Sequence, residues 1–514
     1  MRSLRVVFIL IFLLSFGQVN AQDNKNVPTP ERWKQITDDL EQYLQKGMKE
    51  WEIPGMAIGI VQGDQVVYTK GFGVKEAGAV SAVSSETIFQ IGSTSKAFTA
   101  AIAAMLQDEG KFNWEDPVIK YLSDFVMYDP WVTREIEVWE LMAQHSGLPG
   151  YSADLLSICG FDRNQIIKAI RYIKPISSFR TKYAYQNNMF LAMAALEEKL
   201  SGKSWEDNIK ERIFKPLGMS DSTLDLASFR QAKDVSFIHM KAKDKIVAVP
   251  MDWKYMNWVY TYAPAGGINS NIKDMVKWLK FQINAGAING KQLISKKNME
   301  FLHSPKTIID EKISGHSAYY AQAWLYMENE PYPVIWHNGG TSGSKTMIAF
   351  VPQEKIGIVI LSNLITGFPE DVAFRFFNNY FGKPLKDNIT EMKEKEKKER
   401  DEELAKIPKA PQQMCPSLTL EQYSGEYQNN VYGKISVSQN NGNLSIFIGP
   451  LKAELKLTHW DKNDFTATWP DFDLSETPTF VRFDVDPDNT VSGVIIGAIN
   501  EDGCGSFEKV QEKK

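Results

Sequence analysis

A serine followed three positions later by a lysine is the first candidate for chemistry in this 514-residue sequence. Ser93 and Lys96 lie where a loop of small residues gives way to a helical pattern, in the stretch FQIGSTSKAFTAAIAAMLQ. A serine hydroxyl becomes a useful nucleophile only when a neighbouring group takes its proton. Residues three apart share a helical face, so we expect the Lys96 amine to point toward the Ser93 hydroxyl. The pair predicts nucleophilic catalysis by serine.

Context distinguishes this pair from others with the same spacing, which begin at Ser270, Ser342 and Ser506. Only Ser93 is followed by a clear amphipathic helix, which ends at Gly110. The N–H groups in the first turn of that helix would favour negative charge beside Ser93. A lysine with the ordinary pKa of about 10.4 is a weak base at neutral pH. A second proton acceptor is therefore expected.

Tyr-x-Asn motifs offer candidates for this second group, and they begin at Tyr185, Tyr255 and Tyr427. Tyr185 immediately precedes a helical run over residues 189–200, whereas Tyr255 lies in an aromatic stretch and Tyr427 in a tail of different character. We predict Tyr185 and Asn187, with Tyr255 as the alternative to Tyr185. A third polar motif, His337-Asn338-Gly339-Gly340, stands at the entry to a hairpin pattern near the end of the main body.

In this order, Ser-x-x-Lys, Tyr-x-Asn and His-x-Gly resemble the motifs of the serine β-lactamase and penicillin-binding protein superfamily, especially its class C branch. The resemblance covers about residues 33–381 and includes QHSGLPG, residues 144–150, and APAGGINSNIKDM, residues 263–275. We interpret the last two stretches as tight glycine turns that shape a cleft. His337 stands where many β-lactamases have lysine, a variant also found in D-alanyl-D-alanine peptidases, esterases and D-aminopeptidases of the superfamily.

The resemblance implies roles for these residues. Ser93 would attack a carbonyl carbon, while Lys96 and Tyr185 would relay its proton to the leaving group; which of the two is the formal base stays open. The backbone N–H groups of Ser93 and Gly340 would form the oxyanion hole. Substrate binding would involve Asn187, His337 and Gly339. Asn187 would position the substrate amide or Lys96, and His337 would support the proton network or a substrate carboxylate. Neutral histidine holds an anion less firmly than lysine, and this departure from the family pattern argues against efficient β-lactam hydrolysis.

The predicted function is that of an exported serine hydrolase. It would form an acyl-enzyme with D-amino-acid peptides, peptidoglycan-derived fragments or β-lactams. The alternatives are an esterase or D-aminopeptidase without useful β-lactamase activity, and a non-catalytic protein that binds cell-wall peptides. Six scattered histidines and the lack of a glycine-rich phosphate loop predict no metal and no cofactor. A net charge of -5 argues against nucleic acid as a partner. The oligomeric state stays open.

The elements that position these residues can be read from hydrophobic periodicity. Residues 33–51 have helical spacing, and pairs of apolar runs around a turn, over 56–73 and 346–363, predict two β-hairpins that flank a mostly helical region. We therefore expect an α+β fold, a β-lactamase/transpeptidase-like antiparallel sheet flanked by helices with a large helical insert, over residues 22–385. A charged helical linker would cover 386–410, and a small all-β, barrel-like domain would cover 411–514.

Residues 1–21 resemble a signal peptide, with two arginines, an apolar run from Val6 to Leu14 and a small-residue cleavage signal that ends at Ala21. The run is shorter than the roughly 20 residues that span a bilayer, so no transmembrane anchor is expected after cleavage. We predict a periplasmic location, with secretion as the alternative. Of three cysteines, Cys415 and Cys504 could pair in an oxidising compartment, and the sequence does not assign a role to Cys159.

Overall fold

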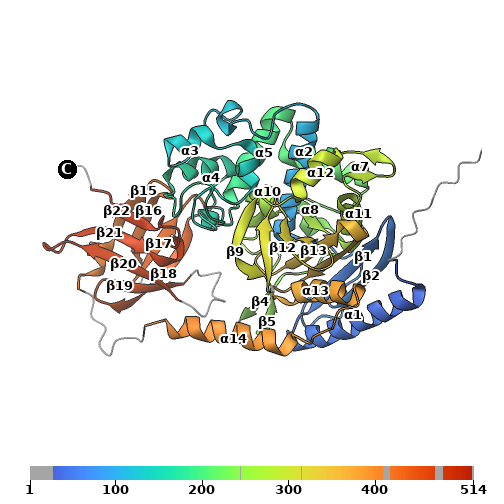
Figure 1. Cartoon of the computed structure of the whole chain (residues 1–514). Coiled ribbons are helices and arrows are strands. Elements are labelled where there is room, and N and C mark those ends of the chain that lie inside the picture. Colours follow the sequence, from blue (N-terminus) through green and yellow to red (C-terminus); the bar gives the residue numbers. More distant parts are fainter. Residues whose placement is uncertain are drawn as a thin grey trace, which may run out of the picture.

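The computed structural model describes residues 27–242, 245–313, 315–408, 417–440, 442–468 and 478–511. Figure 1 shows a large mixed body and a smaller barrel, joined along the lower edge by one long helix. The predicted signal peptide and Cys415 lie outside the described residues, so export and the Cys415–Cys504 pairing stay predictions. Among the helices described, none combines the length and apolar character needed to cross a membrane.

The main body is built on an eight-stranded sheet in the order β2-β1-β14-β13-β12-β11-β10-β9, with every neighbouring pair antiparallel. The strands are β1 (Gly55–Gln62), β2 (Gln65–Gly73), β9 (Thr307–Ile313), β10 (His316–Tyr320), β11 (Leu325–Met327), β12 (Val334–Gly340), β13 (Lys345–Val351) and β14 (Ile356–Ser362). Both predicted hairpins are confirmed, as β1–β2 and β13–β14. Because β1 pairs with β14, the two hairpins share one sheet, and the predicted α+β fold is confirmed.

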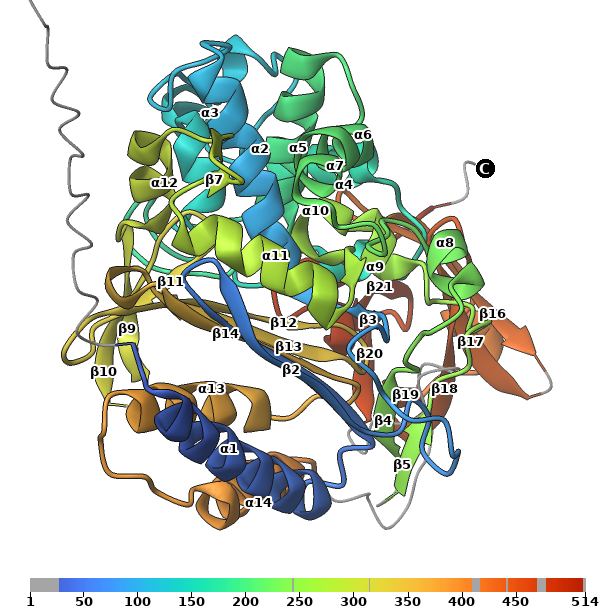
Figure 2. The same ribbon diagram turned by 90° about the vertical axis from the view of Figure 1, so that its right-hand side faces the viewer.

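Helices cover both faces of this sheet (Figure 2). On β14, Ile356, Ile358 and Ile360 belong to one apolar core, while Val359 and Leu361 belong to the other. The first core is closed by α1 (Pro30–Glu50) and α13 (Phe368–Tyr380), the second by α11 (Ile272–Ile283) and the helices above it. A strand buried on both faces reads as a continuous apolar run, which explains the unbroken IGIVIL sequence.

The helix that follows Ser93, α2 (Lys96–Asp108), is buried on all sides from Lys96 to Leu106, so the predicted amphipathic character was wrong. It lies between α5 (Asn188–Ser201), α10 (Ala263–Gly266) and α12 (Lys296–His303), and Phe98 stacks on Trp278 of α11 with ring centroids 3.8 Å apart. The polar Thr99 donates to the Pro264 carbonyl at 2.7 Å, which allows its burial. α2 is thus a central helix that is packed on all sides.

A buried carboxyl on α5 gives a test of this core. Glu197 is fully buried, and burial raises its pKa well above the usual value, with Arg212 opposing the shift only in part. Between the unfolded and folded pKa, only the folded state keeps the proton, so this group makes stability fall as pH rises. The free energy of unfolding of Glu197→Gln, relative to that of the wild type, should therefore be higher at pH 8 than at pH 5. We expect the difference between the two pH values to exceed about 1 kcal/mol. Urea unfolding at both pH values measures the difference. Equal effects at both would contradict it.

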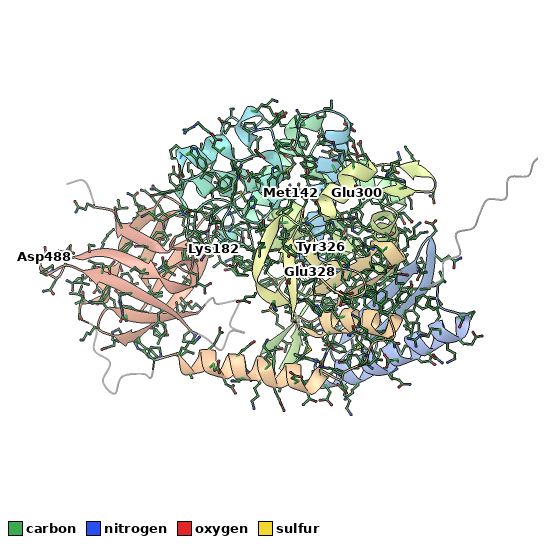
Figure 3. The ribbon with its side chains drawn as sticks, in the orientation of Figure 1. Met142, Lys182, Glu300, Tyr326, Glu328 and Asp488 are labelled. Atoms are coloured by element: carbon green, nitrogen blue, oxygen red, sulfur yellow. The ribbon has the colours of Figure 1, made fainter. Side chains whose placement is uncertain are left out.

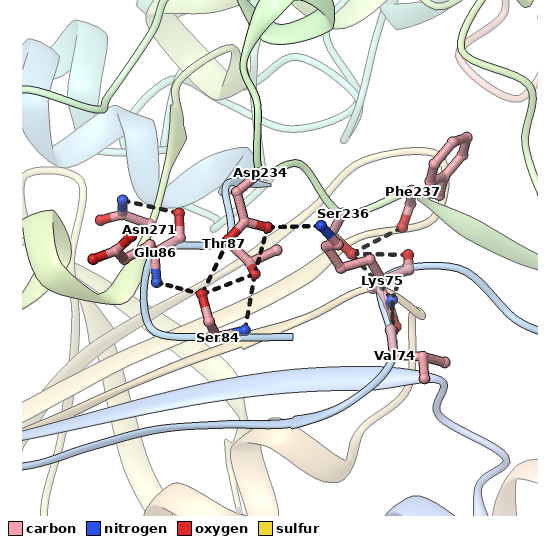
Figure 4. A network of polar contacts seen from close by, with 10 residues as sticks. Val74, Lys75, Ser84, Glu86, Thr87, Asp234, Ser236, Phe237 and Asn271 are labelled. Atoms are coloured by element: carbon pink, nitrogen blue, oxygen red, sulfur yellow. Dashed lines mark hydrogen bonds and ion pairs between the residues drawn. The ribbon is translucent and has the colours of Figure 1, made fainter. Parts of the chain in front are cut away.

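The segment that leads to Ser93 is held by a polar network centred on Asp234 (Figure 4). Its carboxylate accepts hydrogen bonds from Thr87 Oγ1 at 2.9 Å and Ser84 Oγ at 3.0 Å, and Lys75 Nζ lies at 3.1 Å. Immediately after Thr87, the short strand β3 (Phe89–Gln90) pairs with β6 (Asn269–Ser270). These contacts therefore fix the position of the segment that leads into the Ser93 turn.

The remaining elements of the main body are short. They are α3 (Pro130–Glu135), α4 (Arg163–Ala169), α6 (Trp205–Ile209), α7 (Lys215–Leu217), α8 (Leu226–Gln231), α9 (Trp258–Thr261) and the strand pairs β4–β5 (His239–Ala242, Lys245–Ala248) and β7–β8 (Ala287–Ile288, Lys291–Gln292).

Beyond the main body, the charged segment forms α14 (Ile389–Ala405), and only its first residue, Ile389, is buried. It is followed by α15 (Leu420–Tyr423) and a closed eight-stranded barrel, so the predicted barrel is confirmed. The barrel strands are β15 (Gly425–Asn429), β16 (Gly433–Asn440), β17 (Asn443–Ile448), β18 (Ala453–Asp461), β19 (Asp464–Thr468), β20 (Thr479–Val485), β21 (Val491–Ile496) and β22 (Ser506–Lys509).

Candidate active site

Ser93 lies in a 3-10 turn, Gly92–Ser95, directly before α2. Ile91 donates its backbone N–H to the Ile268 carbonyl at 3.0 Å, and Thr94 Oγ1 donates back to the Ile91 carbonyl at 2.8 Å. Gly92 adopts a left-handed φ of 52°, which favours glycine. Ser93 is partly exposed while the residues on either side are buried, so a rigid turn leaves this serine accessible.

Lys96 is fully buried one turn below Ser93, and its Nζ has three hydrogen-bond partners. They are Ser93 Oγ at 3.2 Å, Asn187 Oδ1 at 2.6 Å and the Ala265 carbonyl at 2.9 Å. The last two groups can only accept. In the neutral amine they take both N–H bonds and leave the lone pair directed at Ser93 Oγ. Burial lowers the pKa of Lys96 to about 7, although the charge of Asp154 opposes the shift. The geometry thus suits a base that works near neutral pH.

Tyr185 is the third group at this serine. Burial, with a smaller contribution from Tyr320, raises the pKa of Tyr185 well above its usual value, and a hydrogen bond with the Ser93 side chain offsets this only in part. The Lys96 Nζ lies 4.7 Å from the centroid of the Tyr185 ring. A phenol that keeps its proton at neutral pH can receive one only while giving one up, so it suits a proton relay better than a primary base.

Asn187 connects Lys96 to a carboxyl group. Its Oδ1 accepts from Lys96, and its Nδ2 donates to Asp154 Oδ2 at 2.6 Å. Burial raises the pKa of Asp154 to about 7, the charge of Asp502 adds to this, and Asn187 and Lys96 oppose it. The amide of Asn187 is therefore held at both ends.

His337 lies behind Tyr185 and is only 1% exposed. Its Nε2 is 3.1 Å from Tyr320 Oη and its ring centroid is 6.2 Å from that of Tyr185. The Tyr320 phenol donates to Nε2, so the network assigns the imidazole proton to Nδ1, which donates to the Asn338 carbonyl. Burial and the nearby Lys96 lower the pKa of His337 to about 3. A neutral, covered imidazole supports the aromatic wall and offers no positive charge to a carboxylate.

The end of β12 packs directly on the Ser93 turn. A Cβ on Gly339 would lie 2.1 Å from the Ile91 carbonyl oxygen and 2.9 Å from Ser93 N, and one on Gly92 would lie 2.5 Å from Gly340 N. Only glycine permits this approach, because Cβ atoms do not come within 3.0 Å of such neighbours. The backbone N–H groups of Ser93 and Gly340 are thereby brought into one small region, as an oxyanion hole requires.

The structure thus gathers Ser93, Lys96, Tyr185 and Asn187 into one hydrogen-bonded set, with Gly339 and Gly340 against the same turn and His337 behind it. The alternative, Tyr255, is 1% exposed and packs on Trp253 with ring centroids 5.6 Å apart. The described residues include no cluster of histidine, cysteine, aspartate or glutamate suited to hold a metal ion.

Several groups at the site were not predicted from the sequence. The Ala265 carbonyl lies in the stretch that we interpreted as a shaping turn, and a backbone acceptor leaves no residue-type signal. Tyr151 follows the QHSGLPG stretch; it is 63% exposed, and its ring centroid is 5.2 Å from that of Tyr185. Asp154 lies three residues later and stands in no motif. Only the chain path places these groups beside Lys96.

Comparison with known proteins finds a family match for each part of the chain. The beta-lactamase family profile matches residues 40–375, and a domain of unknown function, DUF3471, matches residues 409–503. Unguisins hydrolase ungD' of Aspergillus campestris is 27% identical over 440 residues, covering 78% of this chain and 78% of the relative. Protein flp of Staphylococcus aureus (strain MW2) is 26% identical over 65% of this chain and 64% of its own length.

Among solved structures, the octameric penicillin-binding protein homologue from Pyrococcus abyssi superposes with a TM-score of 0.60 at 22% identity. The match covers 90% of this chain and 98% of that chain. At this identity the likeness shows a shared fold.

Proposed function

The chain belongs to the beta-lactamase family, and on that basis we propose that it is an exported serine hydrolase of the class C type that forms an acyl-enzyme on Ser93. The observation that carries the proposal is the Lys96 amine, 3.2 Å from Ser93 Oγ with its other two bonds anchored on Asn187 and the Ala265 carbonyl. A lysine fixed in this way, with its pKa lowered by burial, is the activating base that a serine nucleophile needs.

In the proposed reaction, neutral Lys96 takes the Ser93 proton as Oγ bonds to the carbonyl carbon of the substrate. The oxygen that gains the negative charge is held by the N–H groups of Ser93 and Gly340. The proton passes from Lys96, through the Tyr185 phenol, to the leaving amine or alcohol as its bond to carbon breaks. Water then attacks the acyl carbon and gives its proton to the Lys96–Tyr185 relay. The relay returns a proton to Ser93 Oγ as the acyl bond breaks, which frees the serine.

The proposed substrates are amides or esters of the D-amino-acid peptide, cell-wall fragment or β-lactam type. That one relative is named a hydrolase supports hydrolysis as the reaction class.

A second candidate, an esterase or D-aminopeptidase with little β-lactamase activity, is favoured by His337, since its buried neutral ring supplies no cation for the carboxylate of a β-lactam. We propose the periplasm as the location.

Mass spectrometry tests the proposal. After incubation with a β-lactam or with a p-nitrophenyl ester, we expect the protein to gain the mass of the acyl group, and peptide mapping should locate it on Ser93. Turnover of nitrocefin, p-nitrophenyl esters and D-alanyl amides then ranks the substrate classes. If neither reagent gives an adduct, the catalytic proposal is wrong and a cell-wall peptide binding protein becomes the better interpretation.

A further inference from the structure

The barrel contacts the main body next to the candidate active site. Leu451 N donates to the Cys159 carbonyl at 3.0 Å, and the rings of Phe161 and Tyr432 lie 6.4 Å apart between centroids. Figure 1 shows the barrel against the helical end that carries α3 and α4. The main-body residues at this contact lie between 153 and 161, shortly after Tyr151, which packs on Tyr185.

One residue of the barrel domain, Asp502, bonds to the chain beside Asp154. Asp502 Oδ2 accepts a hydrogen bond from Ala153 N at 2.9 Å, and the Ala153 carbonyl accepts one from Tyr262 Oη at 3.2 Å. Ala153 has a left-handed φ of 62°, which is uncommon for a residue with a Cβ. The backbone N–H of Ala153 is therefore fixed by the barrel, and its carbonyl by Tyr262. Together they hold the conformation that turns the chain toward Asn187.

The next residue uses that conformation. Asp154 Oδ2 accepts from Asn187 Nδ2 at 2.6 Å, and Asn187 Oδ1 accepts from Lys96 Nζ at 2.6 Å. The other oxygen, Oδ1, is buried and has no hydrogen-bond partner among the described residues. A buried carboxyl with one unpaired oxygen destabilises the fold, so stability does not explain its presence. Its placement on the far side of Asn187 from Lys96 suggests that it serves the lysine.

We propose that Asp154 is a positioning residue for Lys96, acting through Asn187, and that Asp502 makes the barrel part of the catalytic support by fixing the Ala153–Asp154 turn. The inference rests on the proposed function. It gives the C-terminal barrel a role in the reaction: a main body without Asp502 keeps Ser93 and Lys96 but loses one anchor of the turn behind them.

The charge of Asp154 gives these contacts a measurable effect on the protonation of Lys96. The groups that face Asp154 are Lys96, Asp502 and the phenols of Tyr151, Tyr262 and Tyr432. Of these, only Lys96 can carry a positive charge. An ionised Asp154 therefore holds the proton on Lys96, and removal of that charge lets the amine become neutral at lower pH.

The experiment is the pH profile of Ser93 acylation in the full chain, measured with a p-nitrophenyl ester. Asp154→Asn keeps the size and one acceptor, and we expect its acidic limb to move down by about one pH unit. Asp502→Ala should lower kcat with little change in KM, because substrate contacts remain. Asp488→Asn is the matched control: Asp488 is an exposed barrel aspartate at the tip away from the main body (Figure 3), and its profile should match the wild type.

An Asp154→Asn protein that is acylated with an unmoved acidic limb would overturn the inference. If the wild type is not acylated at all, the proposed function fails separately, and thermal unfolding then tests Asp154. Its folded pKa lies above the ordinary value of about 3.9, so its contribution to wild-type stability is lost as pH rises from 4 through 7. The Tm of Asp154→Asn should then rise relative to wild type between pH 5 and pH 8. Parallel Tm curves would mean that Asp154 titrates like an exposed carboxyl, which would reject its place in the buried set behind Lys96.

Discussion

Lys96→Met should slow acylation of Ser93 by about 10³-fold or more, since proton transfer by a placed side chain typically contributes 10²- to 10⁴-fold. Methionine has a similar unbranched stem and suits the buried position of Lys96, but it cannot take a proton. The Asn187 Oδ1 and the Ala265 carbonyl would also lose their donor. The measurement is the rate of p-nitrophenol release in the first turnover, with Ser93→Ala as the background.

The pH dependence separates loss of the base from loss of the fold. Wild-type acylation should rise with pH through about 7, as Lys96 loses its proton, and the residual rate of Lys96→Met should lack this step. Wild-type stability should also rise with pH. The folded pKa of Lys96 lies below the unfolded value of about 10.4, so between these values only the unfolded state holds the proton and wild-type stability increases with pH. Lys96→Met should therefore gain more stability over wild type at pH 6 than at pH 9.

Lys306→Met is the matched control. Burial lowers the pKa of Lys306 to about 8, and its Nζ donates to Ser304 Oγ at 2.6 Å, outside the hydrogen-bonded set at Ser93. Replacing this partly buried lysine should leave acylation close to the wild-type rate. Wild-type acylation in Lys96→Met, or an equal loss in both variants, would show that Lys96 is not the base.

Local patterns in the sequence account for much of this site. The i, i+3 spacing of Ser93 and Lys96 fixes their relation within one turn, and paired apolar runs around clear turn residues reveal the β1–β2 and β13–β14 hairpins. These features depend on neighbours in the chain, so short-range propensity is enough to predict them.

Features that depend on distant segments could not be predicted. The exposure of α2 is decided by the helices packed around it, and a pattern that looks amphipathic, with Thr99 at a polar position, becomes buried when the Pro264 carbonyl satisfies the hydroxyl. Asp154 meets Asn187 only because Ala153 adopts a left-handed conformation, which its sequence neighbours do not signal. The lowered pKa of Lys96 likewise follows from burial rather than from spacing.

Gly339→Ala should lower kcat by about 10²- to 10³-fold while the protein stays folded, the loss typical of removing one oxyanion-hole donor. Its new Cβ would lie 2.1 Å from the Ile91 carbonyl oxygen and 2.9 Å from Ser93 N, both backbone atoms that cannot rotate away. The end of β12 must then move off the Ser93 turn, and the Gly340 N–H moves with it. Lys96 and Asn187 lie on other elements, so the base should keep its pH dependence.

The adjacent glycine provides the comparison for this variant. A Cβ on Gly340 would have its nearest neighbour, the Ser344 carbonyl oxygen, at 3.9 Å, an ordinary contact, and alanine keeps the backbone N–H. Gly340→Ala should therefore lose far less kcat than Gly339→Ala, although the two positions are consecutive on one strand. Steady-state kinetics with a p-nitrophenyl ester, together with Tm values to verify folding, distinguish them. Equal losses would mean that the approach of β12 to the Ser93 turn does not set the rate, because only the Gly339 substitution pushes those two backbones apart.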